Sequence, residues 1–173
     1  MFGMNLTGGS HATGWELIER RTIAAATRNI LFSNLNTTNN EYLFIMQLYN
    51  SALADTNVSL EFNADTTVTN YYRQVASANT AVINCARIND NTIFAINTGE
   101  CTLGEILIVQ DPGHDSYVRA FTWANNGDPT VVLMQWNALA WVTAGPATQI
   151  NFYSTTNLAF GIGTIISLYR LSR

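Results

Sequence analysis

Short apolar blocks recur along most of this chain, and clusters of Asn, Asp, Gly and Thr separate them. This rhythm is typical of an all-β sandwich or barrel. In block 58–62, for example, Val58, Leu60 and Phe62 alternate with polar residues, which is the period of a strand with one buried face. We therefore predict strands near residues 15–24, 28–33, 41–49, 58–62, 70–75, 81–87, 92–97, 103–110, 117–123, 130–140, 148–153 and 163–171.

The composition favours the same fold class. Of the 173 residues, 47% are hydrophobic and 12% are charged, and this charged share is about half of what globular proteins usually carry. Much of the polar remainder is Thr, which suits strands, and Asn, which suits turns. A chain of this length can form one domain whose core needs no metal or disulfide. We expect a single antiparallel β-sandwich.

Residues 15–28 are the ambiguous segment. Trp15, Ile18 and Thr22 have helical spacing, and the Ala run at 24–26 favours a helix locally. The strand pattern of the rest of the chain argues for the other alternative. We predict a strand.

Two strand blocks carry expectations about burial. Block 41–49 is apolar on both faces, as expected of a covered strand near the middle of an assembly. In block 130–138 the apolar residues alternate with Gln135 and Asn137, so we expect Trp136 to lie in the core. This apolar face consists of Val132, Met134, Trp136 and Ala138.

Several connections have the composition of turns. Residues 125–129 and 111–115 each combine Asn or Asp with Pro and Gly between two apolar blocks, which predicts two hairpin connections. Residues 63–67 close another strand in the same way. Gly161 and Gly163 precede the last strand, where glycine allows a bulge or a close backbone approach.

The charges and the lengths of the apolar runs argue against nucleic-acid binding, a secretory signal peptide and a membrane span. The net charge is −4, no Lys is present, and Arg20-Arg21 is the one adjacent basic pair, so the chain lacks the basic stripe that nucleic acids require. No basic and then apolar leader precedes Arg20, so we expect no secretory signal peptide. The longest apolar runs, 131–134 and 159–166, fall short of the roughly 20 residues that span a bilayer.

Metal sites have weak candidates. His114 lies between Asp111 and Asp115 in one predicted loop, and the other His, His11, is far away. Two scattered His cannot supply the ligand set of a cupin-type metal enzyme. Calcium needs six to eight oxygen ligands from a shaped loop, and the nearby acids follow no calcium-loop order. They are Asp55, Glu61, Asp65 and the turn 89–91. We expect no metal and no cofactor.

The chain also lacks a recognisable catalytic motif, and we expect it not to be an enzyme. It contains no Gly-x-Ser-x-Gly motif, and Cys85 has no His near it in the sequence. Cys85 and Cys101 are either two buried thiols or one bridge. The large aromatic residues either fill the core or form sugar-stacking platforms. The aromatic candidates are Tyr71, Tyr72, Trp123, Trp136 and Trp141.

Residues 1–14 have no periodicity and are rich in Gly, Ser, Thr and Asn, which indicates a flexible N-terminal arm before a domain at 15–173. Phe2, Met4 and Leu6 alternate within it. They can contact a partner on one side of an added strand, so we name these three as candidate anchoring residues; a merely disordered terminus is the alternative.

Both ends of the chain resemble a family of tailed-phage and prophage virion proteins. The segments that carry this resemblance are 15–19, 22–24, 29–35, 41–44, 60–66, 70–72, 150–154 and 165–171. Ala64 stands where the family usually has a turn Gly, and the middle, 80–140, resembles the family little. The resemblance implies a jelly-roll fold that often assembles as trimers. Its members are head-decoration, head-fibre or tail-fibre components.

The expected function is therefore that of a structural component of a phage virion. A capsid decoration or cement protein is the first hypothesis, and a head- or tail-fibre knob that binds a host receptor or a glycan is the alternative. We expect the protein to lie in the virion. The expected partners are its own copies, as a trimer, and the major capsid protein or another virion protein, with a glycan as a further candidate.

Overall fold

The computed structural model describes residues 14–36, 41–52, 54–79, 82–96, 98, 101–110, 115–125, 132–143, 145–155 and 159–172. Within these residues it contains one 3-10 turn, η1 (Val68–Asn70), and twelve strands. The strands are β1 (Gly14–Thr22), β2 (Asn29–Ser33), β3 (Glu41–Tyr49), β4 (Thr56–Phe62), β5 (Tyr71–Asn79), β6 (Val82–Ile88), β7 (Thr92–Ile96), β8 (Cys101–Val109), β9 (Ser116–Asn125), β10 (Val132–Trp141), β11 (Gln149–Ser154) and β12 (Ile165–Ser172).

The predicted all-β class is confirmed, because a strand lies at each block predicted to form one. The ambiguous segment forms β1, so the strand prediction is confirmed over the helical alternative. Gly14, which we expected in the arm, is the first residue of β1 and pairs with Ser172. No helix within the described residues has the length and apolar character of a membrane span.

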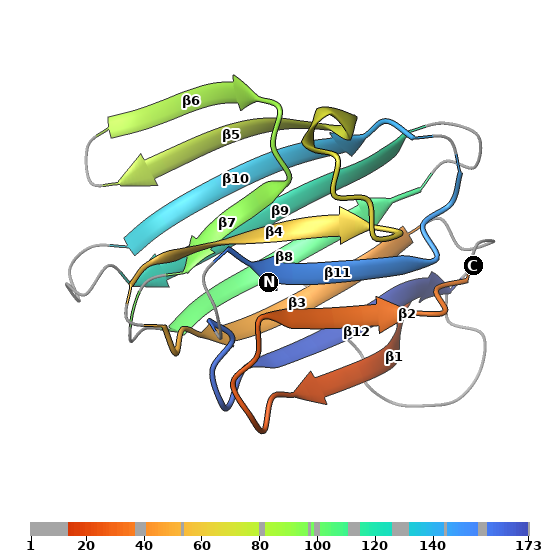
Figure 1. Cartoon of the computed structure of the whole chain (residues 1–173), viewed down its shortest axis with the longest axis horizontal. Coiled ribbons are helices and arrows are strands. Elements are labelled where there is room, and N and C mark those ends of the chain that lie inside the picture. Colours follow the sequence, from red (N-terminus) through yellow and green to blue (C-terminus); the bar gives the residue numbers. More distant parts are fainter. Residues whose placement is uncertain are drawn as a thin grey trace.

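The strands form two antiparallel sheets that face each other, as in a β-sandwich. The large sheet has eight strands in the order β1-β12-β3-β8-β9-β10-β5-β6, and the small sheet has four in the order β2-β11-β4-β7. In Figure 1 the small sheet lies in front of the middle of the large sheet. The edge strands of the large sheet are β1 and β6. We call the face of the large sheet toward the small sheet the inner face, and the opposite one the outer face.

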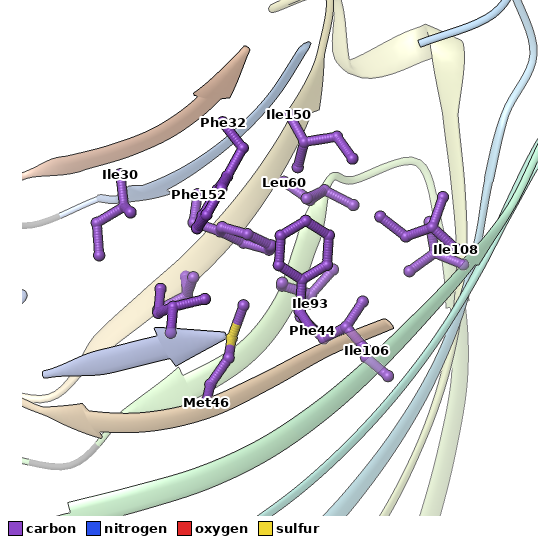
Figure 2. Close-up of a cluster of buried hydrophobic side chains, with 14 of the residues drawn as sticks. Ile30, Phe32, Phe44, Met46, Leu60, Ile93, Ile106, Ile108, Ile150 and Phe152 are labelled. Carbon is purple, nitrogen blue, oxygen red and sulfur yellow. The ribbon is translucent and has the colours of Figure 1, made fainter. Parts of the chain in front are cut away.

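The core fills the space between the two sheets. Phe32 of β2, Phe44 of β3 and Phe152 of β11 meet edge to face, with ring centroids 5.1, 4.9 and 6.2 Å apart, and Figure 2 shows them among Ile and Leu side chains from both sheets. β3 is the third strand of the large sheet, and its residues 42–44 are all buried. The expectation that block 41–49 is covered is therefore confirmed for its inner face and for Leu43, whereas Tyr49 on the other face is 37% exposed.

The turn after β4 has an unusual backbone. Asn63 and Ala64 both have positive φ, at 50° and 59°, and the N–H of Asp65 donates to the carbonyl of Phe62 over 2.8 Å. Two successive left-handed residues define the tight turn that matches strand twist. The predicted turn is confirmed, although Ala64 bears a Cβ where Gly would fit without strain.

Gly161 and Gly163 occupy the predicted close approach before β12. The N–H of Gly161 donates to the carbonyl of Tyr49 over 2.7 Å, and a Cβ on Gly161 would lie 3.0 Å from that oxygen. Gly163 has a φ of 89°. The two predicted hairpins also connect antiparallel neighbours, because β8 pairs with β9 and β9 with β10. Residues 111–114 and 126–131 of their loops lie outside the described residues.

The expectation for β10 was wrong. Trp136 is 42% exposed and Met134 37%, whereas Asn137 and Trp141 are 2% and 3% exposed. Trp141 stacks on Phe62 of the small sheet, with the ring centroids 5.0 Å apart. Because the residues of a strand alternate between faces, the inward position of Trp141 also turns Asn137 inward and Trp136 outward.

Candidate functional site

The outer face of the large sheet carries the exposed apolar side chains that we consider first. One row of cross-strand partners runs from Leu17 of β1 through Tyr169 and Leu43 to Leu107 of β8. Cross-strand partners share a face of the sheet, so these side chains lie together. We define the apolar strip as the outer-face apolar residues of β1, β12, β3 and β8. They are Trp15, Leu17, Leu43, Ile45, Tyr49, Leu103, Leu107, Val109, Ile165, Tyr169 and Leu171.

The apolar strip has no covering layer within the described part of the chain. Leu17 is 49% exposed, Leu103 is 37% exposed and Val109 is 36% exposed. The inner face of the same strands supplies much of the buried core. The small sheet covers the inner face of β12, β3 and β8, whereas their outer face is partly exposed, with Leu43 at 8% exposure in its middle.

The other half of the outer face contains a depression of about 600 Å³ that spans β6, β5, β10 and β9. Ala76 and Ala138 are small residues at its floor, and Trp136 lies beside Ala138 on the same strand. The remaining lining residues with outward side chains are Gln74, Cys85, Arg87 and Arg119. Among the described residues, no Asp or Glu lines it.

The register places two arginines at opposite sides of this depression. Arg87 pairs with Gln74, Gln74 with Ala138, and Ala138 with Arg119. Three strand spacings separate the two arginine backbones by about 14 Å. Neither guanidinium forms a hydrogen bond or ion pair with any residue that the structure describes. Both charges are therefore available to a ligand.

An aromatic group adjoins the depression. The ring of Phe121 lies 5.2 Å from that of Trp136 and 5.1 Å from that of Trp123, centroid to centroid. Of the aromatic candidates from the sequence, Trp141 and Tyr71 are buried in the core, while Trp136 and Tyr72 are exposed. The core interpretation is confirmed for Trp141 and Tyr71, and sugar stacking stays a prediction for the exposed rings.

The acidic candidates for calcium are held apart. Asp55 accepts hydrogen bonds from the N–H and the hydroxyl of Thr98, and Glu61 accepts one from the amide of Asn151. Asp90 accepts from Thr92. Among the described residues, no three His, Cys, Asp or Glu side chains are grouped to hold a metal ion.

Asp65 organises the end of β4 and β10. Its carboxylate accepts hydrogen bonds from the indole N–H of Trp141 at 2.8 Å, the amide of Asn70 at 2.9 Å and the N–H of Thr67 at 2.9 Å. Partial burial raises the pKa of this carboxyl, but the hydrogen bonds from Trp141, Asn70 and Thr67 outweigh burial and lower the pKa below its ordinary value. Asp65 therefore has a structural role and holds Trp141 in place.

Arg73 is a buried cation on the inner face of β5. It is 8% exposed, and its Nη2 lies 3.1 Å from Oδ2 of Asp90. Burial lowers the pKa of Arg73, and the negative charge of Asp90 opposes this effect. This ion pair ties the connection between β6 and β7 to the inner face of β5.

Both alternatives for the cysteines were wrong. Cys85 and Cys101 are free thiols, Cys85 is exposed and Cys101 is half-buried. They lie on different strands that are not neighbours in the large sheet, β6 and β8, so no bridge forms between them. The sequence pattern could not show this, because a Cys in an edge strand is not buried by any neighbour.

The candidate anchoring residues Phe2, Met4 and Leu6 lie outside the described residues, as do His11 and His114. The sequence analysis missed Arg87 and Arg119. The one local signal for each is its place among the polar, outward positions of an alternating strand. Only the pairing of the strands shows that the two arginines share a depression.

Comparison of the chain with protein-family models, with curated proteins and with solved structures found no match in any of the three.

Proposed function

We propose that the protein is a non-enzymatic structural component of a phage virion, a capsid decoration protein that works as a homo-oligomer. The observation that carries this proposal is the apolar strip, which lies uncovered on the outer face of the large sheet. Monomeric proteins seldom expose contiguous apolar surface of this kind, and assembly interfaces bury it. The assignment to a phage particle rests on the resemblance of both chain ends to virion proteins.

The proposed fold is a jelly roll with additions, and the strand order supports it. A jelly roll places its eight strands, counted along the chain, in the orders 1-8-3-6 and 2-7-4-5. With β1, β9, β10 and β12 set aside, eight of the twelve strands remain, and the sheets become β2-β11-β4-β7 and β3-β8-β5-β6. These are the two jelly-roll orders. In this interpretation the β9–β10 hairpin is inserted between β8 and β5, and β12 and β1 extend the sheet beyond β3.

We propose that a second copy of this chain covers the apolar strip, within a closed cyclic assembly that the family resemblance identifies as a trimer. Closed rings are the usual solution for identical subunits that share one interface. The strip also carries Glu105 and Arg20 in one register row, so the surface bears both signs of charge.

A mass measurement tests the assembly. We expect light scattering at micromolar concentration to give about three times the chain mass of 19.1 kDa. Leu103→Glu places a charge in the strip and should shift the mass toward that of one chain. Ile162→Glu is the matched control, because Ile162 is 70% exposed outside the strip. A wild-type mass of one chain, with no increase on particles, would contradict the assembly.

Attachment to the particle is tested separately. Deletion of residues 1–13 leaves β1 intact, so we expect an unchanged melting temperature. If the arm is the anchor through Phe2, Met4 and Leu6, the truncated protein should fail to bind particles stripped of this protein. Unchanged occupancy would rule out the arm and assign attachment to the sandwich.

The depression beside Trp136 favours a second candidate function, that of a fibre knob that binds a receptor or a glycan. Its exposed indole and its two arginines are the groups that such a site uses. Copy number in purified particles separates the two functions. A number comparable to that of the major capsid protein indicates decoration, and a far smaller number indicates a fibre.

A further inference from the structure

We propose that the depression over β6, β5, β10 and β9 binds an acidic saccharide, meaning an oligosaccharide that carries carboxylates. Arg87 and Arg119 would bind the carboxylates, the ring of Trp136 would pack on a sugar ring, and the amide of Gln74 would bond sugar hydroxyls. This site is distinct from the apolar strip, so the proposal does not depend on the decoration function; it rests on the second candidate function and names the ligand class of that site.

The sign of the charge is the first argument. The chain has a net charge of −4 and eight basic residues, yet two of these line one depression in which no described Asp or Glu side chain takes part. Both guanidinium groups lack an ion-pair partner among the described residues. Arginine binds carboxylates through two parallel hydrogen bonds, so an anionic ligand fits this place in an otherwise acidic protein.

The indole is the second argument, and it favours a saccharide over an acidic peptide. Trp136 is 42% exposed and stands beside the Ala76 and Ala138 floor. A flat apolar ring at a shallow, open floor suits the C–H face of a pyranose, which is itself flat and apolar at its centre. A peptide ligand would instead need a sheet edge or deep pockets for its side chains.

The dimensions are the third argument. The volume of about 600 Å³ lies within the range of about 300–1,000 Å³ of small-molecule sites. The arginine backbones stand about 14 Å apart across three strand spacings, a span over which a short oligosaccharide can extend. The site is therefore shaped for a short oligosaccharide.

The test is binding of carboxylated oligosaccharides, with oligogalacturonate, sialylated and hyaluronan fragments as the probes. Each probe is paired with a neutral counterpart in which the carboxylates are methyl-esterified or absent. We expect at least one acidic probe to bind, to quench tryptophan fluorescence and to lose at least about tenfold in affinity when its carboxylates are neutralised. Equal binding of both forms, or no binding of any acidic probe, would overturn the proposal.

Variants locate the site. Arg87→Gln, Arg119→Gln and Trp136→Ala should each weaken binding by at least about tenfold, whereas Trp136→Phe should retain most of it. Arg20→Gln is the matched control, because Arg20 lies on the same face at the opposite edge strand; since Arg20 adjoins the apolar strip, the mass of this variant is measured as well. An equal loss with Arg20→Gln would show unspecific charge attraction and refute the site. Binding of an oligoglutamate peptide but of no saccharide would refute the saccharide.

This result is independent of assembly. Arg87→Gln alters no residue of the apolar strip, so the variant should keep the wild-type mass and should still decorate particles. Loss of saccharide binding with intact decoration supports the site. Saccharide binding by a protein that fails to decorate particles would leave the site standing and remove the decoration function.

Discussion

The two faces of β10 differ in how far each buries its tryptophan. Trp141 faces inward, is 3% exposed and stacks on Phe62 at 5.0 Å, while Trp136 faces outward and is 42% exposed. The strand has apolar residues on both faces, and the small sheet covers only one of them. The difference shows that hydrophobicity identifies a strand here, but the covering layer decides which tryptophan stabilises the fold.

The inner face is further distinguished by what surrounds its tryptophan. The indole N–H of Trp141 donates to Asp65, whose own N–H closes the turn after β4. Trp136 contacts Phe121, 5.2 Å away between ring centroids, and no described residue bonds its indole N–H. One tryptophan is thus part of a bonded core, and the other remains free for contacts with a ligand.

The largest expected effect is that of Trp141→Ala. Removal of a fully packed aromatic ring leaves a cavity and frees Asp65 from its indole donor, so we expect a loss of about 3–5 kcal/mol in the free energy of unfolding. Urea denaturation monitored by circular dichroism measures it. A loss below about 1 kcal/mol would contradict the inward assignment of β10.

Asp65→Asn should have the next largest effect, on the order of 1–3 kcal/mol, because charge-assisted hydrogen bonds from Trp141, Asn70 and Thr67 are weakened together. The folded-state pKa of Asp65 lies below its ordinary value of 3.8. Its contribution is therefore fully present above that ordinary value, and it disappears as pH falls through the lowered pKa.

The pH dependence gives this variant its control. At neutral pH the wild type and Asp65→Asn should differ by the full amount, and the difference should shrink at pH values below the ordinary pKa of aspartate. Asp55→Asn, which breaks bonds to Thr98 at a more exposed place, should cost less. A difference that stays constant down to the lowest pH would show that the charge of Asp65 is not the cause.

The positions of the strands could be predicted because their signals are local. Alternation within β4 and the turn at 63–67 after it lie within a few residues of each other in the chain, and both were predicted. The face of β10 was wrong for a specific reason: the expectation rested on block 130–138, which ends before Leu139 and Trp141. Burial of those two apolar side chains fixes the inner face of β10, and Asn137 lies on the same face.

The depression could not be predicted, because its residues are brought together by pairing across strands that are distant in the sequence. Arg87 and Arg119 become opposite walls only when β10 lies between β9 and β5. The cysteines failed for the same reason, since exposure of Cys85 follows from the position of β6 at an edge. Long-range sheet order leaves no local pattern in the sequence.

A smaller effect concerns the turn that brings Asp65 to Trp141. Ala64 has a φ of 59°, and an L-residue pays roughly 1 kcal/mol or more in this conformation. Ala64→Gly should therefore raise the free energy of unfolding by about 1 kcal/mol, less the entropy that glycine adds to the unfolded chain. Ala86→Gly, in the exposed strand β6, is the control and should lower stability. Destabilisation by Ala64→Gly would show that the turn does not hold the left-handed backbone.

The smallest expected effect is that of Trp136→Ala, and it completes the comparison of the two faces. An exposed ring that contacts Phe121 at its edge contributes little to folding, so we expect a loss of less than about 1 kcal/mol. Trp141→Ala on the same strand is the matched measurement, and the two losses should differ by a factor of at least about three. If Trp136→Ala were as costly as Trp141→Ala, the outer face would have to be covered in solution, and the same denaturation curves would then depend on protein concentration, as unfolding of an assembly does. A large loss that is independent of protein concentration would instead place Trp136 inside the fold and remove the stacking ring from the proposed saccharide site.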